Sequence, residues 1–358
     1  MKYIEEFRNR ELVNTLVKAI ANKSTKPLRI MEVCGGHTMA IRKFGIQHLL
    51  PPQIELLSGP GCPVCVTNRT AIDRAIALAS LPETIITTYG DLIRVPGSAS
   101  SLNQEKAFGK DIRIVYSTMD ALEIARANPG KNIIFPGIGF ETTTPSSAVA
   151  LIEAQSQKLD NFFLLSMHKI MPPAMAALID QGVKIDGYIG PGHVTTIAGA
   201  DMYRPLVDKY DISVVISGFE PVDLLQSVYM LVSMAEEGRH GVDIQYRRAV
   251  TDKGNSKAMQ IVNRVFEPCD DEWRGLGLIP GSGLKIKPEF SNHDASEHFS
   301  INTPPAHEPA GCLCGEVLRG LKKPIDCKLF STVCTPANPI GACMVSGEGA
   351  CQAYFNYR

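Results

Sequence analysis

The sequence has few of the features that mark a membrane protein or a nucleic-acid-binding protein. No apolar run reaches about eighteen residues, so we expect no transmembrane helix. A net charge of −1 and a pI of about 6.7 give no basic surface for nucleic acid or anionic lipid. Residues 1–20 predict a charged amphipathic helix, and they lack the basic segment and apolar stretch of a signal peptide. We therefore expect a cytoplasmic protein, in which clustered cysteines indicate metal or redox chemistry.

Three common cofactor motifs are also missing. Residues 137–141 lack the third glycine of a dinucleotide fingerprint, which argues against a nicotinamide site. Residues 281–285 are too short for a Walker A loop, and no Ser or Thr follows Lys285. The Cys-x3-Cys-x2-Cys triplet of radical S-adenosylmethionine enzymes is absent as well.

The sequence does contain eight short apolar runs, rich in Ile, Val and Leu, separated by segments with helical periodicity. Nearly continuous apolar runs of this length predict buried parallel strands joined by crossover helices, and thus an α/β fold. The predicted strands cover residues 28–33, 54–59, 84–90, 112–117, 132–137, 162–167, 187–192 and 212–218.

Two short motifs occur twice, each time after a predicted strand. The Gly-Pro-Gly of residues 58–62 returns in 189–193, and the Gly-Phe-Glu of 139–141 returns in 218–220. This repetition predicts two similar Rossmann-like domains whose strand ends face one cleft. Open α/β sheets bind their ligands at the carboxyl ends of their strands. A region without the pattern of strands (226–300) and a small cysteine-rich iron–sulfur domain would follow. The expected parts are an N-terminal helix (1–27), a first α/β domain (28–130), a second α/β domain (131–225) and a helical, cysteine-rich region (226–358).

Cys34 directly follows the first predicted strand. Gly35 and Gly36 allow the backbone to approach a ligand closely, and His37 is near enough to assist. Free N–H groups at a strand-to-helix turn would lower the pKa of the thiol. The alternative is a buried cysteine of the core, but the flanking sequence favours a functional thiol.

Cys62 and Cys65 form a Cys-x-x-Cys motif that follows a Gly-Pro-Gly turn and precedes a helix. Two thiols at this spacing can close a reversible disulfide. The alternatives are half of a zinc site or unpaired structural thiols. No second ligand pair lies nearby in the sequence, so redox work or iron ligation is favoured.

Three further polar residues follow predicted strands: Asp91, Glu141 and His193. Each alone is typical of a turn or a cap, and their convergence on a cleft lined by cysteine would make them functional. His168 is a weaker candidate, and Cys269 has no partner spacing and is interpreted as incidental.

Six of the ten cysteines lie in the last forty-seven residues, and no histidine lies beside them. Thiolates are soft ligands that suit either a four-iron cluster or zinc, and the spare pair favours the cluster. Spacing alone leaves fifteen choices of four ligands. One choice takes Cys312, Cys327, Cys334 and Cys351 as ligands, and it leaves Cys314 and Cys343 as a pair.

Taken in order, these motifs resemble the HypD family of nickel–iron hydrogenase maturation proteins. The resemblance spans residues 30–351 and lies in Cys-Gly-Gly-His-Thr, Gly-Pro-Gly-Cys-Pro-Val-Cys, Gly-Phe-Glu-Thr-Thr, Gly-Pro-Gly-His-Val and the cysteine tail. It implies two α/β domains and a cluster domain. It also implies a scaffold with redox activity, rather than a conventional turnover enzyme, on which the Fe(CN)2CO unit of the hydrogenase is assembled.

The resemblance further implies partners and residue roles. A small HypC-type chaperone would offer one thiolate to the transient Fe(CN)2CO iron and Cys34 the other, with His37 as neighbour, while a HypE-type protein would donate cyanide. The chain would be a monomer that forms hetero-complexes. Two other classes stay open, a stand-alone iron–sulfur thiol oxidoreductase and a zinc-stabilised binding module. The implied cysteine roles are a redox pair (Cys62, Cys65), ligands of a [4Fe-4S] cluster (Cys312, Cys327, Cys334, Cys351) and a second redox pair (Cys314, Cys343).

Overall fold

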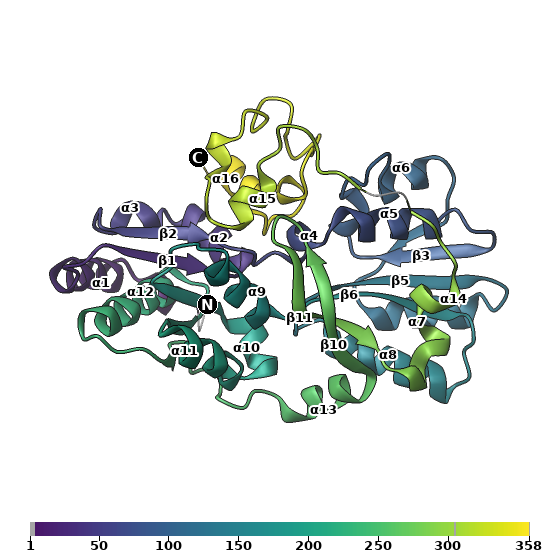
Figure 1. Ribbon diagram of the computed structural model, residues 1–358, viewed down its shortest axis with the longest axis horizontal. Helices are drawn as coiled ribbons and strands as arrows, with labels where there is room; N and C mark the ends of the chain where they lie inside the picture. Colours follow the sequence, from purple (N-terminus) through teal and green to yellow (C-terminus); the bar gives the residue numbers. More distant parts are fainter. Residues whose placement is uncertain (1–3, 304–305, 358) are drawn as a thin grey trace.

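The computed structural model describes residues 4–303 and 306–357, which fold around two parallel β-sheets (Figure 1). All eight predicted strands are present, and every pairing within the two sheets is parallel. The first sheet has the order β2-β1-β7-β8-β9, with β1 (Leu28–Glu32), β2 (Ile54–Ser58), β7 (Gly187–Pro191), β8 (Ser213–Ser217) and β9 (Val242–Ile244). The second sheet has the order β4-β3-β5-β6, with β3 (Thr84–Thr88), β4 (Ile112–Ile114), β5 (Asn132–Gly139) and β6 (Phe162–His168).

The sheets do not divide the chain at the expected boundaries. β1 and β2 pair with β7 to β9, and β3 to β6 form the other sheet, so neither 28–130 nor 131–225 is one half of the molecule. The chain leaves the first sheet after β2 and returns to it at β7. Both Gly-Pro-Gly motifs therefore lie at strands of the first sheet, where one in each domain was expected. The expectation was wrong because a repeated motif does not determine which strands hydrogen-bond to each other. We call the first sheet with its helices the first half, and the second sheet with its helices the second half.

Amphipathic helices cover both faces of the first sheet. Their buried side chains, such as Ile20, Ile41 and Leu225, pack on apolar residues of the strands. Among the described residues, no helix is both long and apolar enough to cross a membrane. One face carries α1 (Arg10–Lys23), α2 (Gly35–Lys43), α3 (Ile46–Leu49) and α12 (Pro221–Glu236), preceded by the short η1 (Glu5–Arg8). The other face carries α9 (Met171–Asp180), α10 (Gly192–Ala198), η3 (Ala200–Tyr203) and α11 (Arg204–Tyr210).

The second half begins after a short helix between the halves, α4 (Pro63–Val66). Several of its helices begin at side-chain caps that the sequence supplies. The side chain of Asn68 accepts the N–H of Ala71, and Ser117 and Asp120 form a capping box. The helices of this half are α5 (Arg69–Leu78), η2 (Leu92–Arg94), α6 (Leu102–Ala107), α7 (Thr118–Ala127), α8 (Thr144–Ser156), η4 (Pro288–His293) and α14 (Ala295–His298).

An antiparallel hairpin lies between the halves, and the prediction that residues 226–300 contain no strands is wrong. The hairpin pairs β10 (Phe266–Trp273) with β11 (Gly277–Ile286), after α13 (Ser256–Val265). Between its buried ends, its first strand alternates half-buried and exposed residues, and the exposed ones include Asp270 and Glu272, so it lacks the continuous apolar run of the parallel strands. At its tip the single tryptophan, Trp273, is buried, stacks on Phe140 and donates its indole N–H to Ser282.

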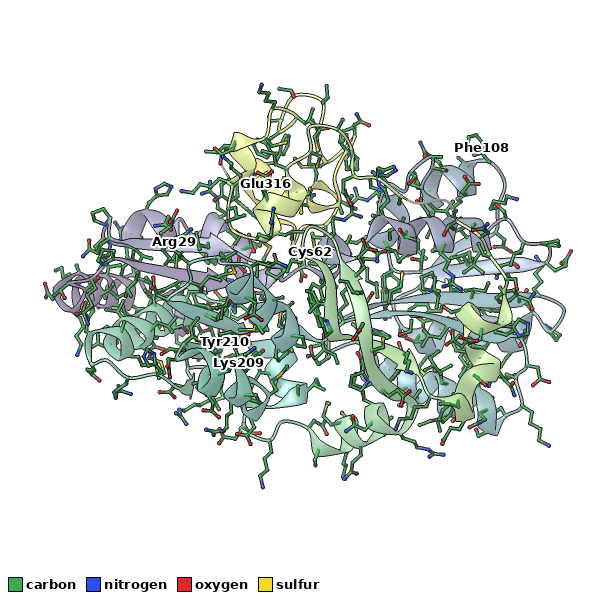
Figure 2. The ribbon with its side chains drawn as sticks, viewed as in Figure 1. Arg29, Cys62, Phe108, Lys209, Tyr210 and Glu316 are labelled. Atoms are coloured by element: carbon green, nitrogen blue, oxygen red, sulfur yellow. A yellow bond between two sulfur atoms is a disulfide. The ribbon has the colours of Figure 1, made fainter. Side chains whose placement is uncertain are left out.

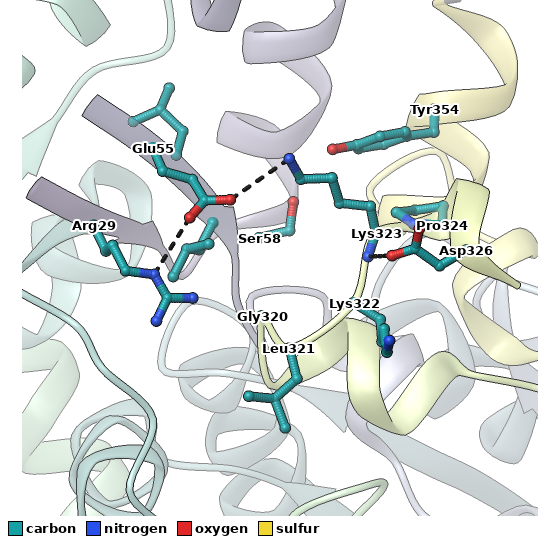
Figure 3. A pocket seen from close by; sticks show the side chains of 12 residues that line it. Arg29, Glu55, Ser58, Gly320, Leu321, Lys322, Lys323, Pro324, Asp326 and Tyr354 are labelled. Atoms are coloured by element: carbon teal, nitrogen blue, oxygen red, sulfur yellow. Dashed lines mark hydrogen bonds and ion pairs between the residues drawn. The ribbon is translucent and has the colours of Figure 1, made fainter. Parts of the chain in front are cut away.

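The cysteine-rich tail rests on top of both halves (Figure 1). An exposed ion pair joins it to the edge of the first sheet, where Glu55 of β2 pairs with Lys323 of the tail (3.5 Å) as well as with Arg29 of β1 (3.3 Å), as Figure 3 shows. Such surface pairs contribute at most about 1 kcal/mol each. The fully buried Met344 and Val345 therefore hold the tail more firmly. Its short helices are α15 (Cys314–Leu318), η5 (Pro324–Asp326), η6 (Ala342–Met344) and α16 (Ala350–Asn356).

Candidate functional site

The strand order of the first sheet brings Cys34 and His193 together. In this sheet β1 and β7 are neighbours. The strand that follows β1 in the chain, β2, lies on one side of this pair, and the strand that follows β7, β8, lies on the other side. The carboxyl ends of β1 and β7 thus form a topological switch point, where open α/β sheets bind ligands. Cys34 follows β1 and His193 follows β7, and the Cys34 Sγ lies 3.7 Å from the His193 Nδ1. Of the three polar residues that follow predicted strands, His193 is thus the one that contacts Cys34.

A buried carboxyl group, which the sequence analysis did not single out, orients Cys34. Glu32 accepts the backbone N–H of Cys34 (3.0 Å) and the hydroxyl of Thr38. Burial raises the pKa of Glu32 to about 8, and these hydrogen bonds only partly oppose the shift. A glutamate within the apolar strand of residues 28–33 was the available signal, since buried acids are rare unless they have a structural or functional partner.

His37 lies beside Cys34 but hydrogen-bonds elsewhere. Its Nε2 donates to the carbonyl of Gly218 (3.0 Å), and its ring lies 4.9 Å from that of Phe219. Burial lowers the pKa of His37 to about 4, so the ring is neutral near pH 7. His37 therefore ties the end of β1 to the end of β8 as a neutral donor.

The Cys34 thiol is closed off, where an open cleft and a lowered thiol pKa were expected. Only 1% of Cys34 is exposed, and the neighbouring glycines pack against Glu348 of the tail and against Phe219. The backbone N–H groups of the turn do favour the thiolate, but burial outweighs them and raises the pKa of Cys34, and the nearby Glu348 adds to this rise. The expectation of a lowered pKa is wrong because it neglected desolvation.

Cys62 and Cys65 form a disulfide immediately beside Cys34. Gly61 packs against the backbone of Cys34, and its carbonyl accepts the N–H of Gly35 (3.1 Å). Figure 2 shows Cys62 near the centre of the molecule, where the two halves and the tail meet. The Sγ of Cys65 lies 3.9 Å from the carbonyl of Ala342, the residue before Cys343. The disulfide thus lies between Cys34 and the cysteines of the tail.

Two other predicted site residues contact different parts of the molecule. Asp91 accepts the hydroxyl of Ser346 (2.6 Å), so it fixes the segment of the tail that covers Cys34. His168 bonds through Nε2 to the hydroxyl of Ser147 (2.9 Å), and burial lowers its pKa to about 4. Cys269 lies half-buried in the hairpin as a free cysteine, in line with its interpretation as incidental.

Glu141 lies on the interface of the halves, away from the sulfur atoms. Its Oε1 accepts the backbone N–H of Met171 at the start of α9 (3.1 Å), and its Oε2 has no hydrogen-bond partner among the described residues. Burial is the main cause that raises the pKa of Glu141 to about 7.

The raised pKa of Glu141 predicts a pH-dependent stability. Between pH 4.5 and 7 the unfolded chain releases this proton while the folded chain retains it, so the free energy of unfolding falls as the pH rises. We expect Glu141→Gln to remove up to about 3 kcal/mol of this decline. Urea unfolding of both proteins at pH 5 and pH 7.5 measures it. The surface variant Glu123→Gln should decline as the wild type does, and an equal decline in Glu141→Gln would contradict the prediction.

The tail brings four of its six thiols into contact. Cys314 interacts with Cys312, Cys343 and Cys351. Cys327 and Cys334 contact the same segments, because their sulfur atoms lie 3.6 Å from the carbonyl of Gly311 and 3.4 Å from the N–H of Ile340. Within residues 4–303 and 306–357, no group of three or more His, Cys, Asp or Glu has the arrangement of a metal site. All six thiols nevertheless lie in one small region.

A buried cation tests whether this region fits an anionic metal–thiolate group. Arg274, at the tip of the hairpin, is 3% exposed and donates to Thr67 and Glu308. Its Nη2 is buried and has no hydrogen-bond partner in the described part of the chain. Its charge favours the thiolates of Cys312 and Cys343 by lowering their pKa, although other groups decide the net shift of each. A buried guanidinium with one N–H group still free among the described residues, beside soft donors, fits a group that carries negative charge on sulfur.

The fold and the site define a thiol-rich α/β protein, with one thiol at a switch point, a neighbouring disulfide and a six-cysteine tail. The chain belongs to the HypD family, whose model, described as the hydrogenase formation hypA family, matches residues 11–358. It is 48% identical to hydrogenase maturation factor HypD2 of Bradyrhizobium diazoefficiens, over all of this chain and 97% of that protein. It is 44% identical to hydrogenase maturation factor HypD of Escherichia coli, over all of this chain and 98% of that protein.

Proposed function

We propose that this chain is a hydrogenase maturation factor on which the Fe(CN)2CO unit is assembled, with Cys34 as its ligand to the iron. The observation that carries the proposal is the pairing of Cys34 with His193 at the switch point, beside the Cys62–Cys65 disulfide. The iron is cargo. A HypC-type chaperone would supply a second thiolate, and a HypE-type protein would supply cyanide. A thiolate-bound iron in a buried site suits these ligands, since burial limits the access of water that would compete for the metal.

The position of the disulfide supports a redox role for Cys62 and Cys65. Reduction of this bond takes two electrons and two protons, and a dithiol in the tail can supply both by thiol–disulfide exchange while it becomes a disulfide itself. Cys314 and Cys343 interact with each other and are the proposed dithiol. The short path from Cys65 to Ala342 supports their communication with the disulfide.

The tail is proposed to hold a [4Fe-4S] cluster. Four thiolates suffice for such a cluster, and Cys312, Cys327, Cys334 and Cys351 are the proposed ligands. When bound, the cluster would supply single electrons. The buried guanidinium of Arg274 supports the proposal, because it would offset negative charge on the sulfur atoms.

Anaerobic isolation of the chain with a small partner that begins with a cysteine tests the assembly function. We expect a brown complex with broad visible absorbance and with infrared bands of cyanide and carbon monoxide on iron. A brown protein that reduces disulfides of other proteins and never shows these bands would favour the alternative, a stand-alone iron–sulfur thiol oxidoreductase. A colourless protein with bound zinc and no iron would contradict both.

A further inference from the structure

An apolar cavity of about 330 Å³ lies between the two halves, apart from the thiols. Its volume is within the range of small-molecule sites, roughly 300–1,000 Å³. Helix α13 closes one side, where it packs against both α8 and α10, and Figure 1 shows this helix below the hairpin. The lining residues include Ile170 before α9, Ala198 of α10, Met202 of η3, Phe266 of β10 and Leu284 of β11.

Glu141 gives this cavity its one buried charged group. The residue is 6% exposed and lines the cavity. Its Oε1 accepts the N–H of Met171, while its Oε2 is buried and has no partner among the residues that the structure describes. The hydroxyl of Thr144 donates to the carbonyl of Phe140 (2.9 Å), so it does not satisfy the carboxyl group. Asn263 is exposed. A ligand with a donor group would therefore find one acceptor in an otherwise apolar space.

The chemistry of the lining selects the charge of the ligand. None of the described residues that line the cavity is a lysine, an arginine or a histidine, so an anionic ligand would meet only the carboxyl group. An unpaired buried carboxyl oxygen costs free energy that a charged N–H donor recovers best. Met202 and Met259 contribute flexible side chains that adapt to the shape of an apolar body.

We propose that the cavity between the halves binds a small primary amine with an apolar body, whose ammonium group pairs with Oε2 of Glu141. The ligand would contact α9, α10, α13 and the hairpin at once, so it would join the first half to the second. This site does not depend on the iron-assembly function.

Binding of benzylamine to the full-length chain tests the proposal, with benzyl alcohol and benzoate as probes of the same ring but different charge. We expect saturable binding of benzylamine by calorimetry with a Kd below about 1 mM, at least tenfold tighter than benzyl alcohol, and none of benzoate. Glu141→Gln keeps the shape of the side chain and should weaken benzylamine at least tenfold while benzyl alcohol changes little.

A second variant fills the cavity from the opposite wall. Ala198→Phe should weaken both benzylamine and benzyl alcohol, and its circular dichroism and urea midpoint report whether it folds. Equal affinity for benzylamine and benzoate would overturn the proposal. So would unchanged benzylamine binding in Glu141→Gln, or the absence of saturable binding to the folded wild type.

Discussion

Replacement of Cys34 by serine is expected to reduce the iron that bears cyanide and carbon monoxide to background in the complex with the small partner. Serine fits the space of the thiol, but a hydroxyl is a poor ligand for the soft, electron-rich iron of this unit. His193 lies 3.7 Å from the sulfur and does not replace it, because its imidazole is partly buried and carries no negative charge. Infrared spectra and iron content of the purified complex measure the loss.

Cys269→Ser is the matched control for this experiment. Cys269 is also a free cysteine, and it lies half-buried on the hairpin with no predicted role. We expect its complex to keep the infrared bands of the wild type. The tail should keep its visible absorbance in both variants, because Cys34 is not one of the proposed cluster ligands. Cyanide bands of wild-type intensity in Cys34→Ser would refute Cys34 as the iron ligand.

Gly61→Ala is expected to destabilise the chain by about 3 kcal/mol or more. A Cβ at residue 61 would overlap the backbone of Val33 and Cys34, and backbone atoms cannot rotate away as a flexible side chain does. The substitution would push the Cys62–Cys65 turn away from the end of β1. Urea unfolding followed by the fluorescence of the single tryptophan, Trp273, measures the effect on stability.

Gly130→Ala serves as the control for this substitution. A Cβ at Gly130 meets nothing within 4 Å, so its urea midpoint should stay near that of the wild type. If Gly61→Ala unfolds at the same urea concentration as Gly130→Ala, the close contact of Gly61 with the backbone of Val33 and Cys34 does not limit the side chain at this position, and the prediction is wrong. A Gly61→Ala protein that does not fold at all supports the prediction.

Much of the fold could be predicted because the central parallel strands are buried on both faces and are therefore nearly continuously apolar. The short edge strand β9 is only partly buried and was not predicted. The hairpin was not predicted, since the exposed Asp270 and Glu272 of β10 interrupt its apolar pattern. The division into halves was wrong for a different reason. Local sequence determines where a strand begins and ends, whereas the partner of β1 is decided by the packing of residues more than a hundred positions away.

The site was predicted in part. Strand ends pointed to Cys34 and His193, because parallel strands deliver their carboxyl ends to one edge. The covering of Cys34 by Glu348 could not be read from the sequence, because the contact joins opposite ends of the chain. The grouping of the tail cysteines likewise depends on the irregular backbone of residues 312–351. The spacing of the six cysteines alone allows fifteen choices of four cluster ligands.

The contact between Gly35 and Glu348 has a kinetic consequence. Because only 1% of Cys34 is exposed, the proposed binding of iron would require the covering segment of the tail to move first, and this movement would set an upper limit to the rate of loading. Ser346, held by Asp91, belongs to the same segment, and Cys343 and Cys351 flank it. Under the proposed function, a cluster bound in the tail would restrain the residues that flank this segment, so its occupancy would govern how often Cys34 is accessible.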